Sequence, residues 1–142
     1  MVVGDDTAGA IGSGMLVLLG AQKGDGQEEM IYLADKMLNL RIFEDENGKM
    51  NRSLLEVGGD LLVVSQFTLL ADCRKGRRPS FFDAMEPQAA SAVVGAFVDY
   101  VRSREVHVEQ GIFGAMMNVT LTNDGPVTIL LDSRELRSRT VS

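Results

Sequence analysis

The feature that most constrains this chain is the uninterrupted apolar run Leu61-Leu62-Val63-Val64, which stops abruptly at Ser65. A strand that is aliphatic at every position has no polar face to turn toward water, so both of its faces must be covered. The run therefore predicts a sheet with further layers packed against it. The polar residues that follow need hydrogen-bond partners, and at a strand end they either fix a loop or face a ligand.

The other patterns predict one α/β domain over the 142 residues. An apolar run between Gly14 and Gly20 predicts a further strand. Apolar residues recur at helical spacing from Met30 to Leu38 and from Ala90 to Val101, the second run shortly after a proline at position 87. Short strands are expected around residues 42–46, 54–57, 106–109, 116–122 and 127–131. We expect a mixed, largely antiparallel sheet with two main helices on one face, and a polar tail at 134–142 that frays.

Composition limits the possible functions. Lys and Arg number 14 and Asp and Glu number 20, which gives a net charge of −6 and argues against a uniformly basic nucleic-acid binder. A single Cys excludes an internal disulfide framework, and a single His excludes a multi-histidine metal site. No apolar run approaches the ~20 residues of a membrane span. We expect a cytoplasmic protein without metal or cofactor.

Three conventional catalytic arrangements remain open on paper. His107 lies in a polar stretch and is more typical of a solvated histidine than of a general base. Cys73 lies beside two basic residues that would lower its pKa, so a dyad with His107 is conceivable, although an incidental cysteine is the simpler interpretation. The acidic residues 44–46 are more typical of a solvated hairpin than of a cation site.

Two further segments have both an ordinary and a functional interpretation. Gly125-Pro126 is an ordinary turn signal, but glycine before proline also permits close backbone approach to another molecule. The second segment is the dense basic run Arg74, Lys75, Arg77 and Arg78, which is either a solvated loop or a contact for phosphates.

Taken in order, the segments SQFTL, ADCRKGRRPSF and TNDGPVTILLDS closely resemble those of the D-aminoacyl-tRNA deacylases. The likeness covers nearly the whole chain and includes GAIGSGMLVLLG and GIFGAMMNVTL. The resemblance implies the deacylase fold and an enzyme that hydrolyses the ester between a D-amino acid and the terminal adenosine of tRNA. It also implies removal of glycine mischarged on tRNA and rejection of L-aminoacyl-tRNA. Family members are metal-free homodimers with the active site at the interface.

The resemblance assigns chiral selection to Gly125 and Pro126, which would enter the partner's pocket through a cis peptide bond. Their carbonyl oxygens would accept hydrogen bonds from the substrate ammonium group. An L side chain would then collide with the main chain, whereas glycine has no side chain to reject.

The opposite wall would be formed by Ser65, Gln66, Phe67 and Thr68. The amides of Phe67 and Thr68 would hold the ester carbonyl and its developing oxyanion, while the ribose 2′-hydroxyl helps to activate water. Thr68 as a nucleophile would lack an adjacent base. Two further expectations concern the RNA. Phe113 and Met117 would line the adenine pocket, with core packing as the alternative, and the basic run 74–78 would contact the tRNA backbone.

The chain departs from the family pattern at its start. The strand that usually precedes the GxIGxG segment, and that carries an arginine supporting the Gly-Pro loop, is predicted to be missing. Leu70 stands where tyrosine is common. Two alternatives follow: a catalytically weakened nucleic-acid-binding relative, or an enzyme that hydrolyses another ester.

Overall fold

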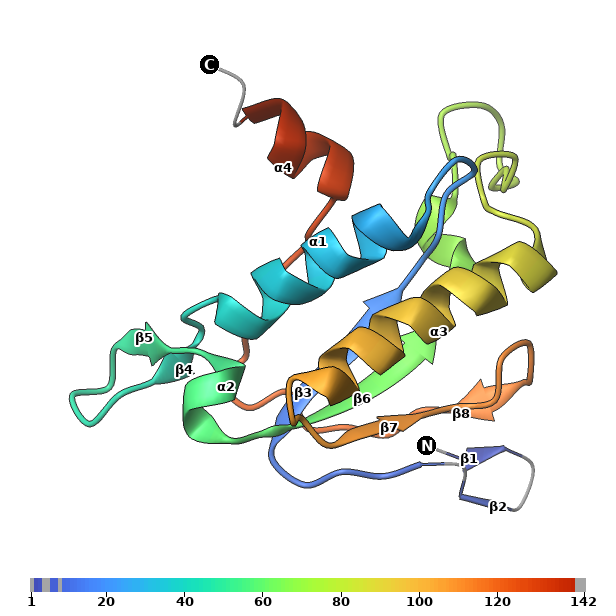
Figure 1. The fold of residues 1–142 in the computed structure, drawn as a ribbon. Helices are drawn as coiled ribbons and strands as arrows, with labels where there is room; N and C mark the ends of the chain where they lie inside the picture. Colours follow the sequence, from blue (N-terminus) through green and yellow to red (C-terminus); the bar gives the residue numbers. More distant parts are fainter. Residues whose placement is uncertain (1, 4–5, 8, 140–142) are drawn as a thin grey trace.

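A three-stranded parallel sheet organises the chain in this computed structural model, which describes residues 2–3, 6–7 and 9–139 (Figure 1). Strand β6 (Asp60–Ser65) lies between β3 (Gly14–Leu19) and β7 (Val108–Gln110). Residues 61–64 of β6 are all buried, which confirms the prediction of a strand covered on both faces.

The prediction of a largely antiparallel sheet was wrong. Chain direction in the main sheet is set by helical crossovers: helix α1 (Gln27–Asn39) lies between β3 and β6 in the sequence, and helix α3 (Pro87–Ser103) between β6 and β7. Each crossover returns the chain to the same end of the sheet, so the strands run parallel.

Antiparallel pairing is confined to short strands. β4 (Phe43–Glu44) pairs with β5 (Met50–Arg52), and β1 (Val2–Val3) pairs with both β2 (Asp6–Thr7) and β8 (Met117–Asn118). The sheet arrangement is therefore mixed, as expected, but its largest part is parallel. The absence of the family's first strand stays a prediction.

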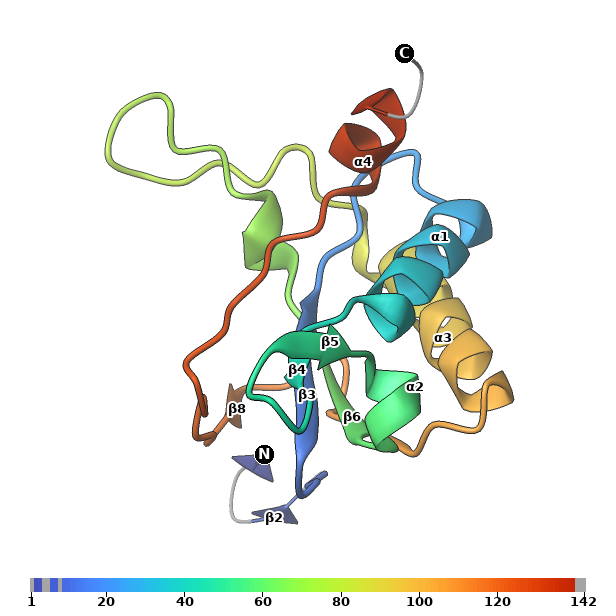
Figure 2. The ribbon, with the colours of Figure 1, turned by 90° about the vertical axis from the view of Figure 1, so that its left-hand side faces the viewer.

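Helices α1 and α3 pack side by side on one face of the sheet, as the apolar spacing predicted (Figures 1 and 2). Helix α3 begins at Pro87, the expected first position. The Tyr100 hydroxyl on α3 donates a hydrogen bond to Asp35 on α1, which links the two helices at their polar edge. A short helix, α2 (Leu54–Val57), replaces the strand expected over residues 54–57 and is capped by the Ser53 hydroxyl.

The opposite face of the sheet is covered only in part. Leu62 and Val64 contact a small cluster of partly buried residues: Ile11, Leu16, Met117 and Val119. From β8 the chain crosses this side of the sheet in extended form (Figure 2). Residues 121–130 are all exposed, and no strand forms over residues 127–131 because no described strand lies beside them to pair.

The C-terminal part of the described chain is helical. Helix α4 (Ser133–Arg139) begins after Asp132, whose carboxylate accepts a hydrogen bond from the Arg134 amide at 2.9 Å. Fraying of the tail stays a prediction for residues 134–139, and residues 140–142 lie outside the described part. Among the described helices, none is long and apolar enough to cross a membrane.

Candidate functional site at the end of strand β6

The SQFT segment (residues 65–68) begins at the carboxyl end of the central strand. Ser65 closes β6, and the short 3₁₀ helix η1 (Phe67–Leu70) follows directly. The Gln66 amide donates to the Leu19 carbonyl at 2.8 Å and so anchors the turn to β3. Gly20 permits this approach, because a Cβ there would lie 2.6 Å from a methyl group of Leu70 and 3.0 Å from the Gln66 carbonyl oxygen.

Backbone donors are available in this segment. The first hydrogen bond of η1 runs from the Leu69 amide to the Gln66 carbonyl at 3.2 Å, so the amides of Phe67 and Thr68 precede the helical ladder. Both residues are exposed. Two neighbouring amides free of intrahelical partners form the kind of donor pair that binds a carbonyl oxygen or an oxyanion.

The Thr68 side chain is held by its neighbour. Gln66 Nε2 donates to Thr68 Oγ1 at 2.5 Å, which leaves the threonine proton free to point elsewhere. Among the interactions of the described residues, none joins Thr68 to a carboxylate, an imidazole or an amine. The arrangement therefore supports positioning by the hydroxyl and does not supply the base that a nucleophile needs.

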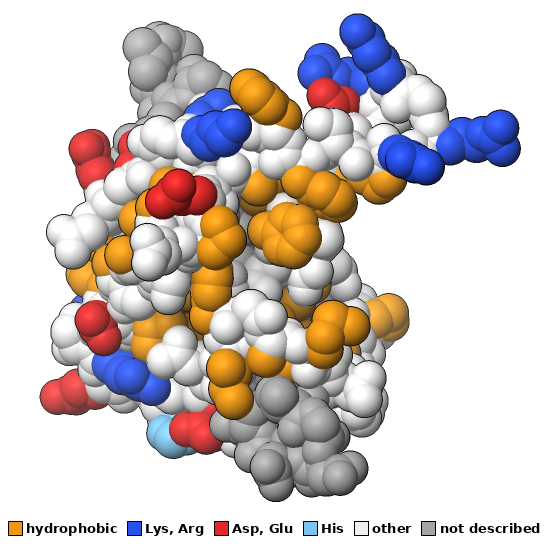
Figure 3. Space-filling view, turned by 90° about the vertical axis from the view of Figure 1, so that its right-hand side faces the viewer, with side chains coloured by type: hydrophobic (Ala, Val, Ile, Leu, Met, Phe, Trp, Pro, Cys, Tyr) orange, Lys and Arg blue, Asp and Glu red, His pale blue; other side chains and the backbone are white. Residues whose placement is uncertain are grey.

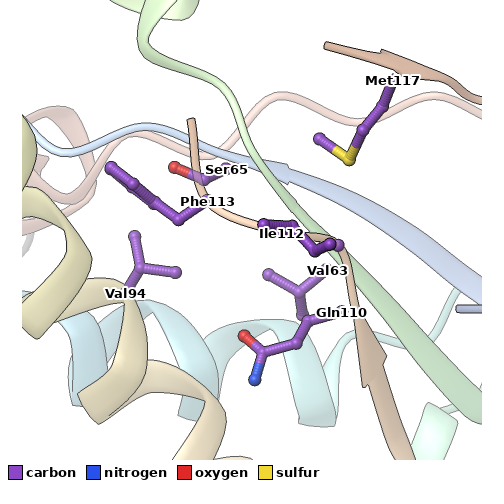
Figure 4. A pocket seen from close by; sticks show the side chains of 8 residues that line it. Val63, Ser65, Val94, Gln110, Ile112, Phe113 and Met117 are labelled. Atoms are coloured by element: carbon purple, nitrogen blue, oxygen red, sulfur yellow. The ribbon is translucent and has the colours of Figure 1, made fainter. Parts of the chain in front are cut away.

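A small pocket adjoins this strand end (Figure 4). It brings together three of the predicted site residues, Ser65, Phe113 and Met117. The remaining lining residues are Val63, Val94, Gln110, Gly111 and Ile112. Its cavity volume is about 20 Å³, which is room for roughly one water molecule. A single chain therefore does not enclose a ligand of ordinary size at this strand end.

Sequence reasoning missed several of these lining residues. Val63 and Val94 follow strand and helix patterns that are indistinguishable from ordinary core packing. Gln110 did carry a signal, because it is a polar residue at the end of β7, as Ser65 is at the end of β6. The carboxyl ends of parallel strands meet at one edge of a sheet, so a correct prediction of strand direction would have found it.

The Gly-Pro turn (residues 123–128) has a defined shape but lies apart from the SQFT segment of its own chain. The Gly125-Pro126 peptide bond is cis. The Asn123 side chain closes the turn: its Oδ1 accepts from the Val127 amide at 2.9 Å, and its Nδ2 donates to Thr128 Oγ1 at 3.0 Å. Among the described residues, no hydrogen bond joins this turn to residues 65–68.

The basic run lies on a projecting loop, here called the basic loop (residues 72–80; Figure 2). Asp72 and Ser80 exchange two backbone hydrogen bonds, of 2.7 and 2.8 Å, that close its base. Arg74 donates to both carboxylate oxygens of Asp72, at 2.9 and 2.7 Å. Hydrogen bonding from Arg74 lowers the pKa of Asp72 to about 2 and in turn raises the pKa of Arg74.

This pairing divides the basic residues into two groups. Arg74 is occupied by Asp72, whereas Lys75, Arg77 and Arg78 are exposed and form no ion pair within the described chain. Figure 3 shows Lys and Arg side chains gathered on one projecting arm, above a face that carries many hydrophobic side chains. The loop therefore carries three cations available to an anionic partner.

The conventional catalytic alternatives find no support in the geometry. His107 is exposed, and its Nε2 lies 3.4 Å from Glu109 Oε2. No interaction of the described residues joins His107 to Cys73 or to a serine. Asp45 accepts hydrogen bonds from the Asn51 side chain and from the Lys49 and Asn47 amides within its own hairpin, which lowers its pKa. The described residues contain no group of three or more His, Cys, Asp or Glu arranged to hold a metal.

The Asp72–Arg74 pair predicts a measurable titration. A carboxyl whose folded pKa of about 2 lies below its ordinary 3.8 stabilises the folded loop above pH 4, and this stabilisation is lost as the pH falls toward 2. We expect Arg74→Gln to return the pKa of Asp72 toward 3.8, and Arg77→Gln to leave it unchanged. Carboxyl ¹³C NMR titration measures both values. Equal values in the two variants would contradict the assigned pairing.

Comparison with known proteins places this chain in a family. The family described as D-Tyr-tRNA(Tyr) deacylase matches residues 1–132. A D-aminoacyl-tRNA deacylase of Thermus aquaticus is 57% identical over 135 residues, which are 95% of this chain and 89% of the relative. One from Roseiflexus sp. is 58% identical over 137 residues, 96% of this chain and 88% of the relative.

A solved structure agrees with these sequence matches. The structure titled "c-Myc DNA Unwinding Element Binding Protein" superimposes with a TM-score of 0.85 at 41% identity, covering 92% of this chain and 89% of that one. The chain belongs to the D-Tyr-tRNA(Tyr) deacylase family.

Proposed function

We propose that this chain is a D-aminoacyl-tRNA deacylase, which hydrolyses the ester of D-aminoacyl-tRNA, and of glycine mischarged on tRNA, to release amino acid and tRNA. The observation that carries the proposal is the pair of free amides at Phe67 and Thr68, beside a pocket that joins Ser65 to Phe113 and Met117. Family membership and relatives named D-aminoacyl-tRNA deacylase support it. Because aminoacyl-tRNA is used where translation takes place, we place the enzyme in the cytoplasm.

The amide pair supplies the electrostatic part of the reaction. Water adds through its oxygen to the ester carbonyl carbon, and the negative charge that develops on the carbonyl oxygen is held by the amides of Phe67 and Thr68. The bond to the ribose oxygen then breaks, and that oxygen leaves as a hydroxyl with a proton from the attacking water. The neighbouring 2′-hydroxyl of the substrate helps to activate the water, because no interaction of the described residues joins Thr68 to a base.

The pocket walls orient the substrate for this attack. Phe113 and Met117 form an apolar surface on which the terminal adenine rests. The Thr68 hydroxyl, held by Gln66, has a proton left to donate toward the substrate. Ser65 lies in the same pocket at the end of β6 and adds a second hydroxyl.

A second copy of the chain completes the site in this proposal. Residues 121–130 are exposed along their whole length and include four large hydrophobic side chains: Leu121, Val127, Ile129 and Leu130. Such a surface is characteristic of a protein interface. In a symmetric dimer, the same segment of each copy covers the other, so the Gly-Pro turn of one chain reaches the pocket of its partner.

Chiral selection follows from that insertion. The backbone oxygens of Gly125 and Pro126 accept hydrogen bonds from the substrate ammonium group and fix the orientation of the α-carbon. A D side chain then points away from the turn, whereas an L side chain points into its main chain. Rejection rests on backbone atoms, which no side-chain substitution removes.

A direct assay tests the function. The chain is incubated with D-tyrosyl-tRNA and with L-tyrosyl-tRNA, and the released tyrosine is measured. We expect release from the D ester and not from the L ester. Binding without hydrolysis would indicate the nucleic-acid-binding alternative, and equal hydrolysis of both esters would contradict chiral selection by the Gly-Pro turn.

Gly125 provides a test of the turn. Its φ of 139° is one that other residues rarely adopt, and a Cβ there would lie 3.0 Å from a Val127 methyl and 3.2 Å from the Val127 amide nitrogen. We expect Gly125→Ala to lower D-tyrosyl-tRNA hydrolysis by about 10-fold or more, the effect of ~1–3 kcal/mol of backbone strain at the turn. The control is Gly95→Ala, where a Cβ meets no atom within 4 Å. Equal rates in the two variants would rule out the assigned role.

The basic loop provides a test of tRNA contact. We expect replacing Arg77 and Arg78 together by alanine to weaken tRNA binding. The slope of log affinity against log salt should fall by up to about 1.4–1.8, since each lost phosphate contact removes ~0.7–0.9. Arg74→Ala should have a smaller effect, because Asp72 already occupies that guanidinium. An unchanged slope in the double variant would show that Arg77 and Arg78 do not contact the tRNA phosphates.

A further inference from the structure

A second aromatic and cationic cluster lies outside the pocket. The side chain of Phe82 is 76% exposed, an unusual exposure for so large an apolar ring. Lys23 Nζ lies 3.7 Å from the centroid of this ring, within the range of a cation–π interaction. Since the lysine occupies one face of the ring, the exposure of Phe82 leaves the other face open to solvent.

Three separate segments build this cluster. The loop after β3 pairs with residues 83–85, which follow the basic loop in the chain. The Lys23 amide donates to the Asp83 carbonyl at 2.9 Å, and the Met85 amide donates to the Ala21 carbonyl at 3.0 Å. At the start of α4, the exposed Arg134 guanidinium donates to the Lys23 carbonyl at 3.4 Å. Backbone hydrogen bonds thus fix the loop of Lys23, whose ammonium lies over the ring, and the Arg134 guanidinium contacts the same loop.

Aromatic contacts connect this cluster with the candidate active site. Phe67 of the SQFT segment meets Phe81 edge to face, with ring centroids 5.0 Å apart. Phe81 directly precedes Phe82, and both rings follow the basic loop in the chain. A strip of exposed aromatic residues therefore leads from the proposed oxyanion site to the cations of Lys23 and Arg134.

We propose that Phe82, Lys23 and Arg134 form an RNA subsite for an unpaired nucleotide that precedes the terminal adenosine of the tRNA. A base stacks on the open face of Phe82, while the ammonium and guanidinium groups pair with the adjoining phosphates. An exposed aromatic ring beside fixed cations is the combination that binds single-stranded nucleic acid. This inference rests on the proposed function and adds to it a contact outside the pocket.

Kinetics on two substrates test the subsite. D-Tyrosyl-tRNA carries the preceding nucleotides, whereas D-tyrosyl-adenosine, the ester on an isolated nucleoside, does not. We expect Phe82→Ala and Phe82→Leu to raise KM for D-tyrosyl-tRNA about 10-fold, the effect of losing one base–aromatic stack, with kcat nearly unchanged. Phe82→Tyr keeps the ring and should restore KM. On D-tyrosyl-adenosine all three variants should equal the wild type.

Matched controls separate the subsite from general surface effects. Met50→Ala removes a hydrophobic side chain that is 51% exposed on β5, and Lys49→Ala removes a neighbouring cation. Neither should change KM, whereas Lys23→Ala should raise KM for D-tyrosyl-tRNA alone. Unchanged kinetics of Phe82→Ala on D-tyrosyl-tRNA, or an equal loss on both substrates, would overturn the proposal.

Direct binding keeps the test independent of catalysis. A fluorescent single-stranded RNA ending in CCA is titrated with the wild type and with Phe82→Ala, and its anisotropy is followed. Weaker binding by the variant supports the subsite, and equal binding refutes it, even if the wild type hydrolyses neither ester. Failure of hydrolysis by the wild type on both esters would refute the proposed function instead.

Discussion

The parallel pairing of β6 between β3 and β7 is the constraint on which the rest of the structure depends. It brings the carboxyl ends of these strands to one edge, where Ser65 ends β6 and Gln110 ends β7. Irregular backbone after such strand ends is where α/β sheets bind ligands. The open amides of Phe67 and Thr68 therefore result from sheet topology as much as from local sequence, since β3 holds the turn through the Leu19 carbonyl.

The fold was predictable from the sequence wherever a periodicity carried the information. Complete burial of residues 61–64 followed from their unbroken apolar character, and both long helices followed from apolar spacing. Strand direction in the main sheet was predicted wrongly, because an apolar run has the same pattern in either orientation. The information lay in the connections, because a long helix between two strands favours parallel pairing.

The candidate site was predictable to the extent that it consists of short contiguous motifs. Residues 65–68, Phe113 and Met117 could be identified, and the structure brings Ser65, Phe113 and Met117 into one pocket. Contacts between segments that lie far apart in the sequence could not be predicted from such motifs. Nothing near Lys23 in the sequence indicates that it covers the ring of Phe82, because that contact depends on the backbone pairing of two loops. The hydrogen bonds by which the Asn123 side chain closes its turn likewise depend on the conformation of that turn.

The charge distribution shows how an acidic chain can bind RNA selectively. Its net charge of −6 repels polyanions in general, so attraction must come from cations that are local and unpaired. Asp72 pairs with Arg74 and at the same time helps to close the base of the loop, which leaves Lys75, Arg77 and Arg78 without an ion pair among the described residues. When the overall charge does not attract RNA, a few local contacts favour an RNA whose aminoacylated end fits the site over other RNA. In the proposed function, specificity therefore depends on geometry at the 3′ end of the RNA, because the net charge of −6 opposes long-range attraction.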